Sequence, residues 1–130
     1  MKTAKYGLIV IFSLSILFHL FVISGIVDYH LVWGGKLKSR VDMLRFEGIS
    51  LGLNALFLFL ILIRVNLLKM NVPRMLMQVL LYLMLGVFGL NTLGNLMSEN
   101  IYEKIIFTPI TALIVVFLLT LLRKKTKHKD

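Results

Sequence analysis

A chain of 130 residues that is 58% hydrophobic and only 16% charged cannot fold as a water-soluble domain, because a domain of this size leaves much of its surface exposed. Its mean hydropathy of +0.90 predicts that this surface faces lipid. The sequence contains no cysteine, which excludes disulfides, thiolate metal sites and thiol redox chemistry. The net charge of +9 is spread over the flanks of apolar segments, so we expect no nucleic-acid partner.

Four apolar segments predict an all-α membrane protein, a four-transmembrane-helix bundle in which residues 1–130 form one domain. A spanning helix needs about 17–25 mostly apolar residues, and a helix satisfies its own backbone hydrogen bonds inside lipid. In chain order, the predicted helices cover residues 6–27, 40–68, 74–97 and 105–123.

The first segment follows a short basic stretch, as the apolar part of a signal peptide does. It is longer than the about 7–15 apolar residues of a signal peptide, and no small-x-small cleavage site follows, so we expect a retained helix. His19 shares a helical face with Ser15, whereas Ser13 and Ser24 lie on the other side. Because an ionisable group is costly against lipid, the His19 face is favoured as the interior one. The simplest interpretation of His19 is a hydrogen-bonded core residue.

The first loop has a distinctive sequence. Trp33 is expected at headgroup depth, where its amphipathic ring is favoured. Gly34 and Gly35 predict a turn directly after it. Ser39 and Asp42 have the spacing of a capping box, which predicts that the second helix begins directly after Ser39.

The second helix carries Arg40, Glu47 and Asn54 on one face, because they repeat every seven residues. Glu47 is expected to pair with Arg40 or with a basic residue of the loop. The GxxxG spacing of Gly48 and Gly52 predicts close helix packing within the chain rather than a dimer face.

Polar residues recur near the third connection. Asn91 and Asn95 share a face of the third helix, and Thr111 lies in the fourth. Thr108 and Pro109 lie in the first turn of the fourth segment and have the order of an N-cap followed by a first helical residue.

The polar residues of the spans gather in one half of the predicted membrane. With span centres near residues 17, 57, 86 and 113, they lie on the side of the first and third loops. This group comprises His19, Asn54, Asn91, Thr92, Asn95, Thr108 and Thr111.

The polar half has two interpretations. One is a set of interhelical hydrogen bonds, each contributing about 0.5–2 kcal/mol. The other is a pocket that opens beneath the first loop and binds a small amphiphile, a lipid headgroup or a peptide. The candidate pocket residues are His19, Glu47, Asn54, Asn91, Asn95 and Thr111. The candidate lid residues in the loop are Trp33, Gly34, Gly35 and Arg40.

The basic residues predict the orientation. Ten Lys and Arg residues lie in or beside the N-terminus, the second loop and the C-terminus, and five lie on the other side. The positive-inside rule therefore predicts that both termini are cytoplasmic. The basic tail that begins at Arg123 is expected to anchor this orientation on an anionic leaflet.

Catalysis needs convergent acid, base or metal groups. His19 and Glu47 are the only candidate pair, and their expected depths differ by about 10 Å. We therefore expect no enzyme and no catalytic, cofactor-binding or metal site. The preferred function is a non-enzymatic accessory or binding protein, whose partners are the lipid bilayer and either another membrane protein or a small amphiphile. The alternative is a small transporter or channel subunit that acts as an oligomer.

The segment 25–48 and a later motif resemble small bacterial four-helix membrane proteins that have a Trp-Gly-Gly-Lys/Arg first loop and no assigned activity. The resemblance implies a four-helix architecture and a location in the bacterial inner membrane. It is carried by Val32-Trp33-Gly34-Gly35-Lys36, Arg45-Phe46-Glu47 and Leu90-Asn91-Thr92-Leu93-Gly94-Asn95.

Overall fold

The computed structural model describes residues 2–123, and within that range it contains helices and turns but no strand. Four helices, each long and apolar enough to cross a membrane, make up most of it. They are α1 (Lys2–Ser24), α2 (Arg40–Arg64), α3 (Arg74–Met97) and α4 (Thr108–Arg123), the last preceded by the π-helical turn η3 (Glu103–Phe107). Two short 3-10 helices, η1 (Tyr29–Leu31) and η2 (Trp33–Gly35), form the first loop. Most of the predicted basic anchor lies in residues 124–130, outside the described residues.

Two helices end earlier than their hydropathy predicts, α1 at Ser24 instead of residue 27 and α2 at Arg64 instead of residue 68. Gly25 has a φ of 84°, and Asn66 has a φ of 61°. A residue in this left-handed region stops an α-helix, and glycine and asparagine adopt it most readily. The apolar residues that follow therefore lie in turns, although hydropathy alone counts them with the helix.

The start of the fourth span also differs from the prediction. Thr108 has helical dihedral angles of φ −59° and ψ −49°, so it does not cap the helix. The helix instead begins at Glu103 and passes through a π-helical turn before Pro109. Proline lacks an N–H and its ring collides with the carbonyl four residues earlier. A wider π-helical turn directly before Pro109 relieves that collision.

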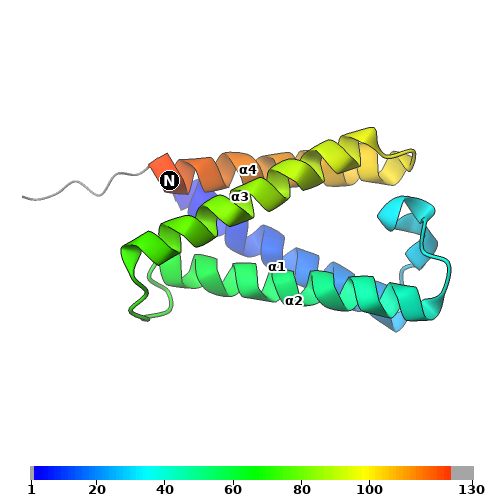
Figure 1. Ribbon diagram of the computed structural model, residues 1–130, viewed down its shortest axis with the longest axis horizontal. Helices are drawn as coiled ribbons and strands as arrows, with labels where there is room; N and C mark the ends of the chain where they lie inside the picture. The colour runs from blue at the N-terminus through cyan, green and yellow to red at the C-terminus, as the bar shows by residue number, and fades with distance from the viewer. Residues whose placement is uncertain (1, 124–130) are drawn as a thin grey trace, which may run out of the picture.

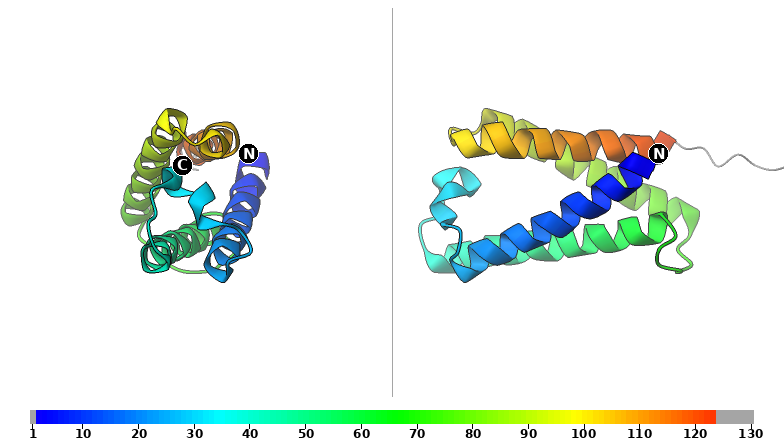
Figure 2. Two further views of the ribbon diagram at one scale, coloured as in Figure 1. Left: turned by 90° about the vertical axis from the view of Figure 1, so that its right-hand side faces the viewer. Right: turned by 180° about the vertical axis from the view of Figure 1, so that it is seen from behind.

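The helices form two hairpins, α1 with α2 and α3 with α4 (Figure 1). The hairpins come together at the end that carries the N-terminus and the second loop, called here the terminal end. They diverge toward the first loop, called here the loop-one end (Figure 2). Seen from the loop-one end, η1 and η2 lie between the two hairpins. The first loop thus occupies the wedge that the diverging helices leave open.

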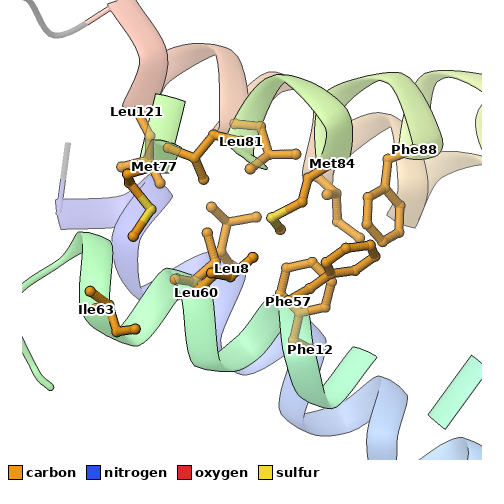
Figure 3. Close-up of a cluster of buried hydrophobic side chains, with 13 residues drawn as sticks. Leu8, Phe12, Phe57, Leu60, Ile63, Met77, Leu81, Met84, Phe88 and Leu121 are labelled. Atoms are coloured by element: carbon orange, nitrogen blue, oxygen red, sulfur yellow. The ribbon is translucent and has the colours of Figure 1, made fainter. Parts of the chain in front are cut away.

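An apolar core fills the terminal half of the bundle and receives side chains from all four helices (Figure 3). Phe12, Phe57 and Phe88 form the boundary of this core toward the loop-one end, and their ring centroids lie 5.5–6.0 Å apart. Each such aromatic contact contributes about 0.5–1.5 kcal/mol beyond the area it buries. The core comprises Leu8, Phe12, Phe57, Leu60, Ile61, Ile63, Met77, Leu81, Met84, Phe88, Ile114, Leu118 and Leu121.

A tight contact between α1 and α4 involves a glycine outside the predicted GxxxG motif. A Cβ at Gly7 of α1 would lie 2.3 Å from Cε2 of Phe117 in α4, so only glycine fits this approach. A Cβ at Gly48 or Gly52 would meet nothing within 4 Å among the described residues. The prediction of tight packing at Gly48 and Gly52 is therefore wrong, because α2 turns these positions outward.

Candidate functional site

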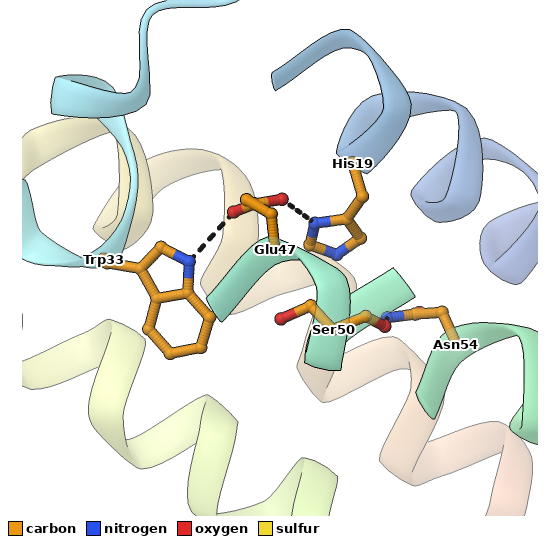
Figure 4. Close-up of polar contacts among 5 residues, drawn as sticks. All are labelled: His19, Trp33, Glu47, Ser50 and Asn54. Atoms are coloured by element: carbon orange, nitrogen blue, oxygen red, sulfur yellow. Dashed lines mark hydrogen bonds and ion pairs between the residues drawn. The ribbon is translucent and has the colours of Figure 1, made fainter. Parts of the chain in front are cut away.

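The loop-one end of the bundle contains a carboxylate that is completely buried. Glu47 is 0% exposed, and its Oε2 lies 2.5 Å from Nδ1 of His19 in α1. Its Oε1 accepts a 2.9 Å hydrogen bond from the indole Nε1 of Trp33 in η2 (Figure 4). A buried charge is tolerated only when it is paired and hydrogen-bonded. Glu47 satisfies this condition with partners from two other elements, and so it joins α1, α2 and the first loop.

The contact between His19 and Glu47 corrects the expectation that their depths differ by about 10 Å. The observed helices have their midpoints at residues 13 and 52. His19 lies six residues and Glu47 five residues from these midpoints, both toward the loop-one end, which places them about 9 and about 7.5 Å away. The prediction that Glu47 pairs with Arg40 or with a basic residue of the first loop is also wrong. Arg40 is exposed, and the partners of the carboxylate are His19 of α1 and the indole of Trp33.

The first loop has a left-handed backbone at three consecutive residues. The φ angles are 55° at Trp33, 65° at Gly34 and 71° at Gly35. The two glycines accept this conformation at no steric cost, whereas a bulky residue with positive φ is rare. Trp33 is held in place by its hydrogen bond to Glu47 and by a ring contact with Phe46 at 5.1 Å.

The first loop also contacts the second hairpin. The amide of Gly34 donates a 2.6 Å hydrogen bond to Oε1 of Glu103, which is only 8% exposed. Nearby, Nδ2 of Asn100 donates to the carbonyl of Leu31 at 2.8 Å. The loop therefore connects both hairpins at the end where they diverge. Glu103 was not among the predicted site residues, although an acidic residue directly before an apolar span is a visible signal in the sequence.

Beneath this loop, between the hairpins, lies a cavity of about 310 Å³. Its floor is formed by Phe57 and Phe88 of the core, and Trp33 and Glu103 belong to its wall. Of the predicted lid residues, Gly34, Gly35 and Arg40 do not line it. The predicted pocket residues all line this one cavity: His19, Glu47, Asn54, Asn91, Asn95 and Thr111.

Among residues 2–123, the polar side chains of the cavity form no hydrogen bonds from one helix to another, apart from the contacts of Glu47 and Glu103. Asn54 donates to Ser50 O of its own helix at 2.8 Å, and Thr111 donates to carbonyls of its own helix. Within residues 2–123, no hydrogen bond involves the side chains of Asn91 and Asn95. These amides are therefore available to a ligand in the cavity.

The acidic residues in the lining of the cavity are Glu47 and Glu103. Nδ1 of His19 faces Oε2 of Glu47, whereas the other ring nitrogen, Nε2, makes no hydrogen bond among residues 2–123. Figure 4 shows Nε2 on the side of the ring where Ser50 and Asn54 lie. In the part of the chain that the structure describes, no Lys or Arg lines the cavity. Among these same residues, no group of three His, Asp or Glu side chains has the arrangement of a metal site.

Comparisons with protein families, curated proteins and solved structures give no match to this chain. The resemblance to small bacterial four-helix membrane proteins therefore stays a prediction.

Proposed function

We propose that this chain is a multi-pass protein of the bacterial inner membrane, with both termini in the cytoplasm. Four helices that are long and apolar enough to span a membrane support the insertion. The two-to-one excess of basic residues on the side of the termini supports the orientation. In this orientation the cavity and the first loop lie in the outer half of the membrane.

We further propose that the protein is a non-enzymatic binding protein for a small amphiphile. The observation that carries this proposal is the cavity beneath the first loop, in which Asn91 and Asn95 have no hydrogen-bond partner among residues 2–123. Ligand sites are concave, mostly apolar and equipped with a few convergent polar groups. A cavity of about 310 Å³ with a phenylalanine floor and polar walls has this character.

A binding role is supported over catalysis by the way in which Glu47 is held. A general base must lie within reach of the proton that it removes. Glu47 is 0% exposed, and its oxygens are hydrogen-bonded to His19 and to Trp33. The carboxylate therefore serves to hold the loop over the cavity.

A binding role is also supported over conduction through one chain. The terminal half of the bundle is filled by the apolar core, which lies directly below the cavity. The cavity thus ends at the phenylalanine floor. A transporter or channel subunit acting as an oligomer is the alternative, and it predicts solute flux across liposomes that contain the purified protein. The binding proposal predicts no such flux.

Cysteine labelling tests the proposed site on a background that has no native cysteine. Asn54→Cys, Asn91→Cys and Asn95→Cys are labelled in vesicles with a charged maleimide that is applied from the loop-one side. Leu90→Cys and Leu93→Cys are matched controls, because both residues are exposed on α3 and line neither cavity.

We expect cysteines at 91 and 95 to react at least about tenfold faster than those at 90 and 93, since a thiol in lipid does not ionise. A bound amphiphile is expected to protect positions 91 and 95. The proposal is wrong if positions 54, 91 and 95 are all as unreactive as the controls.

A further inference from the structure

A second cavity, of about 500 Å³, lies beside the first, between α1, the first loop and the helix that begins at Glu103. Its lining is almost entirely apolar, and Ser15 and Tyr102 are the only polar side chains among the described residues that form it. The two cavities are adjacent and have a common wall. Their shared lining residues are Ile11, Ser15, Phe18, Val32, Phe107 and Ile110.

The apolar cavity lies where α1 and α4 separate. These helices meet closely at Gly7 and Phe117 near the terminal end, and they diverge toward the loop-one end (Figure 2). The cavity is not closed off at this edge, since two residues of its lining, Leu14 and Ile106, are 60% and 48% exposed. In a membrane, this edge faces the hydrocarbon, so an acyl chain can enter sideways without crossing water.

The polar cavity determines which head group fits above that chain. Glu47 and Glu103 are its two carboxylates, and none of the described residues that line either cavity is Lys or Arg. Within residues 2–123, Oε2 of Glu103 accepts no hydrogen bond, whereas Oε1 accepts from Gly34. A carboxylate or phosphate head group would lie close to these carboxylates with no Lys or Arg of the lining to pair with, and like charges in a low dielectric repel strongly. A protonated amine can donate to them.

We propose that the ligand is a single-chain amphiphile with a protonated amine head group. Its head occupies the polar cavity near Glu103 and the Nε2 of His19, and its chain occupies the apolar cavity between α1 and α4. This inference rests on the proposed function, because it specifies the ligand of the same site. The combined volume, with about 310 Å³ for the head and about 500 Å³ for the chain, lies within the range of about 300–1,000 Å³ that is typical of small-molecule sites.

Titration with dodecylamine tests this assignment on the full chain in phosphatidylcholine nanodiscs. Trp33, the only tryptophan of the chain, lies in the wall of the polar cavity and reports binding by its fluorescence. Dodecan-1-ol and dodecanoate have the same chain with a neutral and an anionic head group. We expect a saturable response to dodecylamine, a weaker one to dodecan-1-ol and none to dodecanoate.

Two variants separate the head from the chain. Ile106→Phe narrows the apolar cavity and is expected to weaken dodecylamine binding about tenfold, the equivalent of nearly two buried methylene groups. Ile105→Phe is its matched control, since Ile105 is exposed and lines neither cavity. Glu103→Gln still accepts from Gly34 but removes the charge, and it is expected to weaken amine binding about tenfold with little effect on dodecan-1-ol. If Ile106→Phe does not fold, Leu14→Phe narrows the same cavity from α1.

The outcomes distinguish this inference from the proposed function. Equal binding of dodecanoate and dodecylamine overturns the amine head group. An Ile106→Phe or Leu14→Phe variant that binds like the Ile105→Phe control overturns the chain site. In both cases, protection of Asn95→Cys from maleimide by any of the three amphiphiles still supports the proposed function. If none of the three protects that position, the proposed function fails as well.

Discussion

His19 and Glu47 are 28 residues apart in the chain, and the contact of 2.5 Å between Nδ1 and Oε2 holds α1 against α2 at a common depth. The same carboxylate accepts from Trp33, so the position of the first loop depends on it too. The buried side chain of Glu47 therefore stabilises both the hairpin of α1 and α2 and the position of the first loop over the cavity.

Replacement of Glu47 should reveal this double role. In Glu47→Leu, the indole N–H of Trp33 and the imidazole of His19 lose their acceptor, and we expect the free energy of unfolding to fall by about 3–5 kcal/mol. Glu47→Gln keeps an oxygen for Trp33 and should cost only about 1 kcal/mol. Reversible unfolding in mixed micelles, followed by helical circular dichroism, measures both values. Glu99→Gln is the exposed control, and a Glu47→Leu variant as stable as this control contradicts the assignment.

The contact between α1 and α4 predicts a strong effect of one added methyl group. In Gly7→Ala, the new Cβ would lie 2.3 Å from the ring of Phe117, so the ring or the helix must move. Such overpacking costs about 1–3 kcal/mol. Gly52→Ala, where the Cβ meets no neighbour within 4 Å, should gain up to about 1 kcal/mol from helix propensity.

A double-mutant cycle with Phe117→Leu isolates that contact. The smaller side chain should remove most of the cost of Gly7→Ala, giving a coupling free energy of about 1 kcal/mol or more. Strict additivity of the two substitutions in the unfolding measurement is the result that contradicts the contact.

The left-handed turn of the first loop predicts sensitivity at Gly34. A Cβ there finds its nearest neighbour, Lys36 Cε, at an ordinary 3.7 Å, so the cost of Gly34→Ala comes from the φ of 65°. For an L-residue that cost is about 1–2 kcal/mol. Because the Gly34 amide bonds to Glu103, hydrogen exchange at Gly34 and Gly35 should also accelerate in Glu103→Ala. Lys38→Ala, an exposed position in the same loop, should change neither the stability nor the exchange.

Asp28 predicts a pH effect at the start of the first loop. The backbone hydrogen bond from His30, and then its ring, hold the pKa of Asp28 below the ordinary value of 3.8. A carboxyl whose folded pKa is depressed stabilises the fold above its unfolded pKa, near pH 4, and this contribution is lost as the pH falls through the lowered pKa. An NMR titration should still find a lowered pKa in His30→Ala, because the backbone amide remains. A pKa at or above 3.8 in the unmodified chain contradicts the hydrogen bond.

Features that depend on local sequence could be predicted. Four apolar helices follow from the length and hydropathy of four segments. The cap at the start of α2 is confirmed, because Ser39 Oγ accepts from the amide of Asp42 at 3.1 Å. Both depend on residues within one or two helical turns of one another.

Features that depend on where a helix stops, or on distant segments, could not be predicted. Hydropathy does not reveal that Gly25 and Asn66 have left-handed backbone conformations. The second helix was therefore expected to extend beyond Arg64, and its expected centre lay too far from Glu47. Glu103 was missed because its partner, Gly34, is 69 residues away and reaches it only after the first loop folds between the hairpins.

The distribution of partners around the two buried acids has a consequence for the order of membrane insertion. Both partners of Glu47 come from residues that precede it in the chain, so the first hairpin can enter the bilayer with this acid already hydrogen-bonded by contacts of its own. Glu103 depends on Gly34 of that finished hairpin. Each acid is therefore synthesised after the residues that bind it. The second hairpin can then pack against a first loop that has already folded.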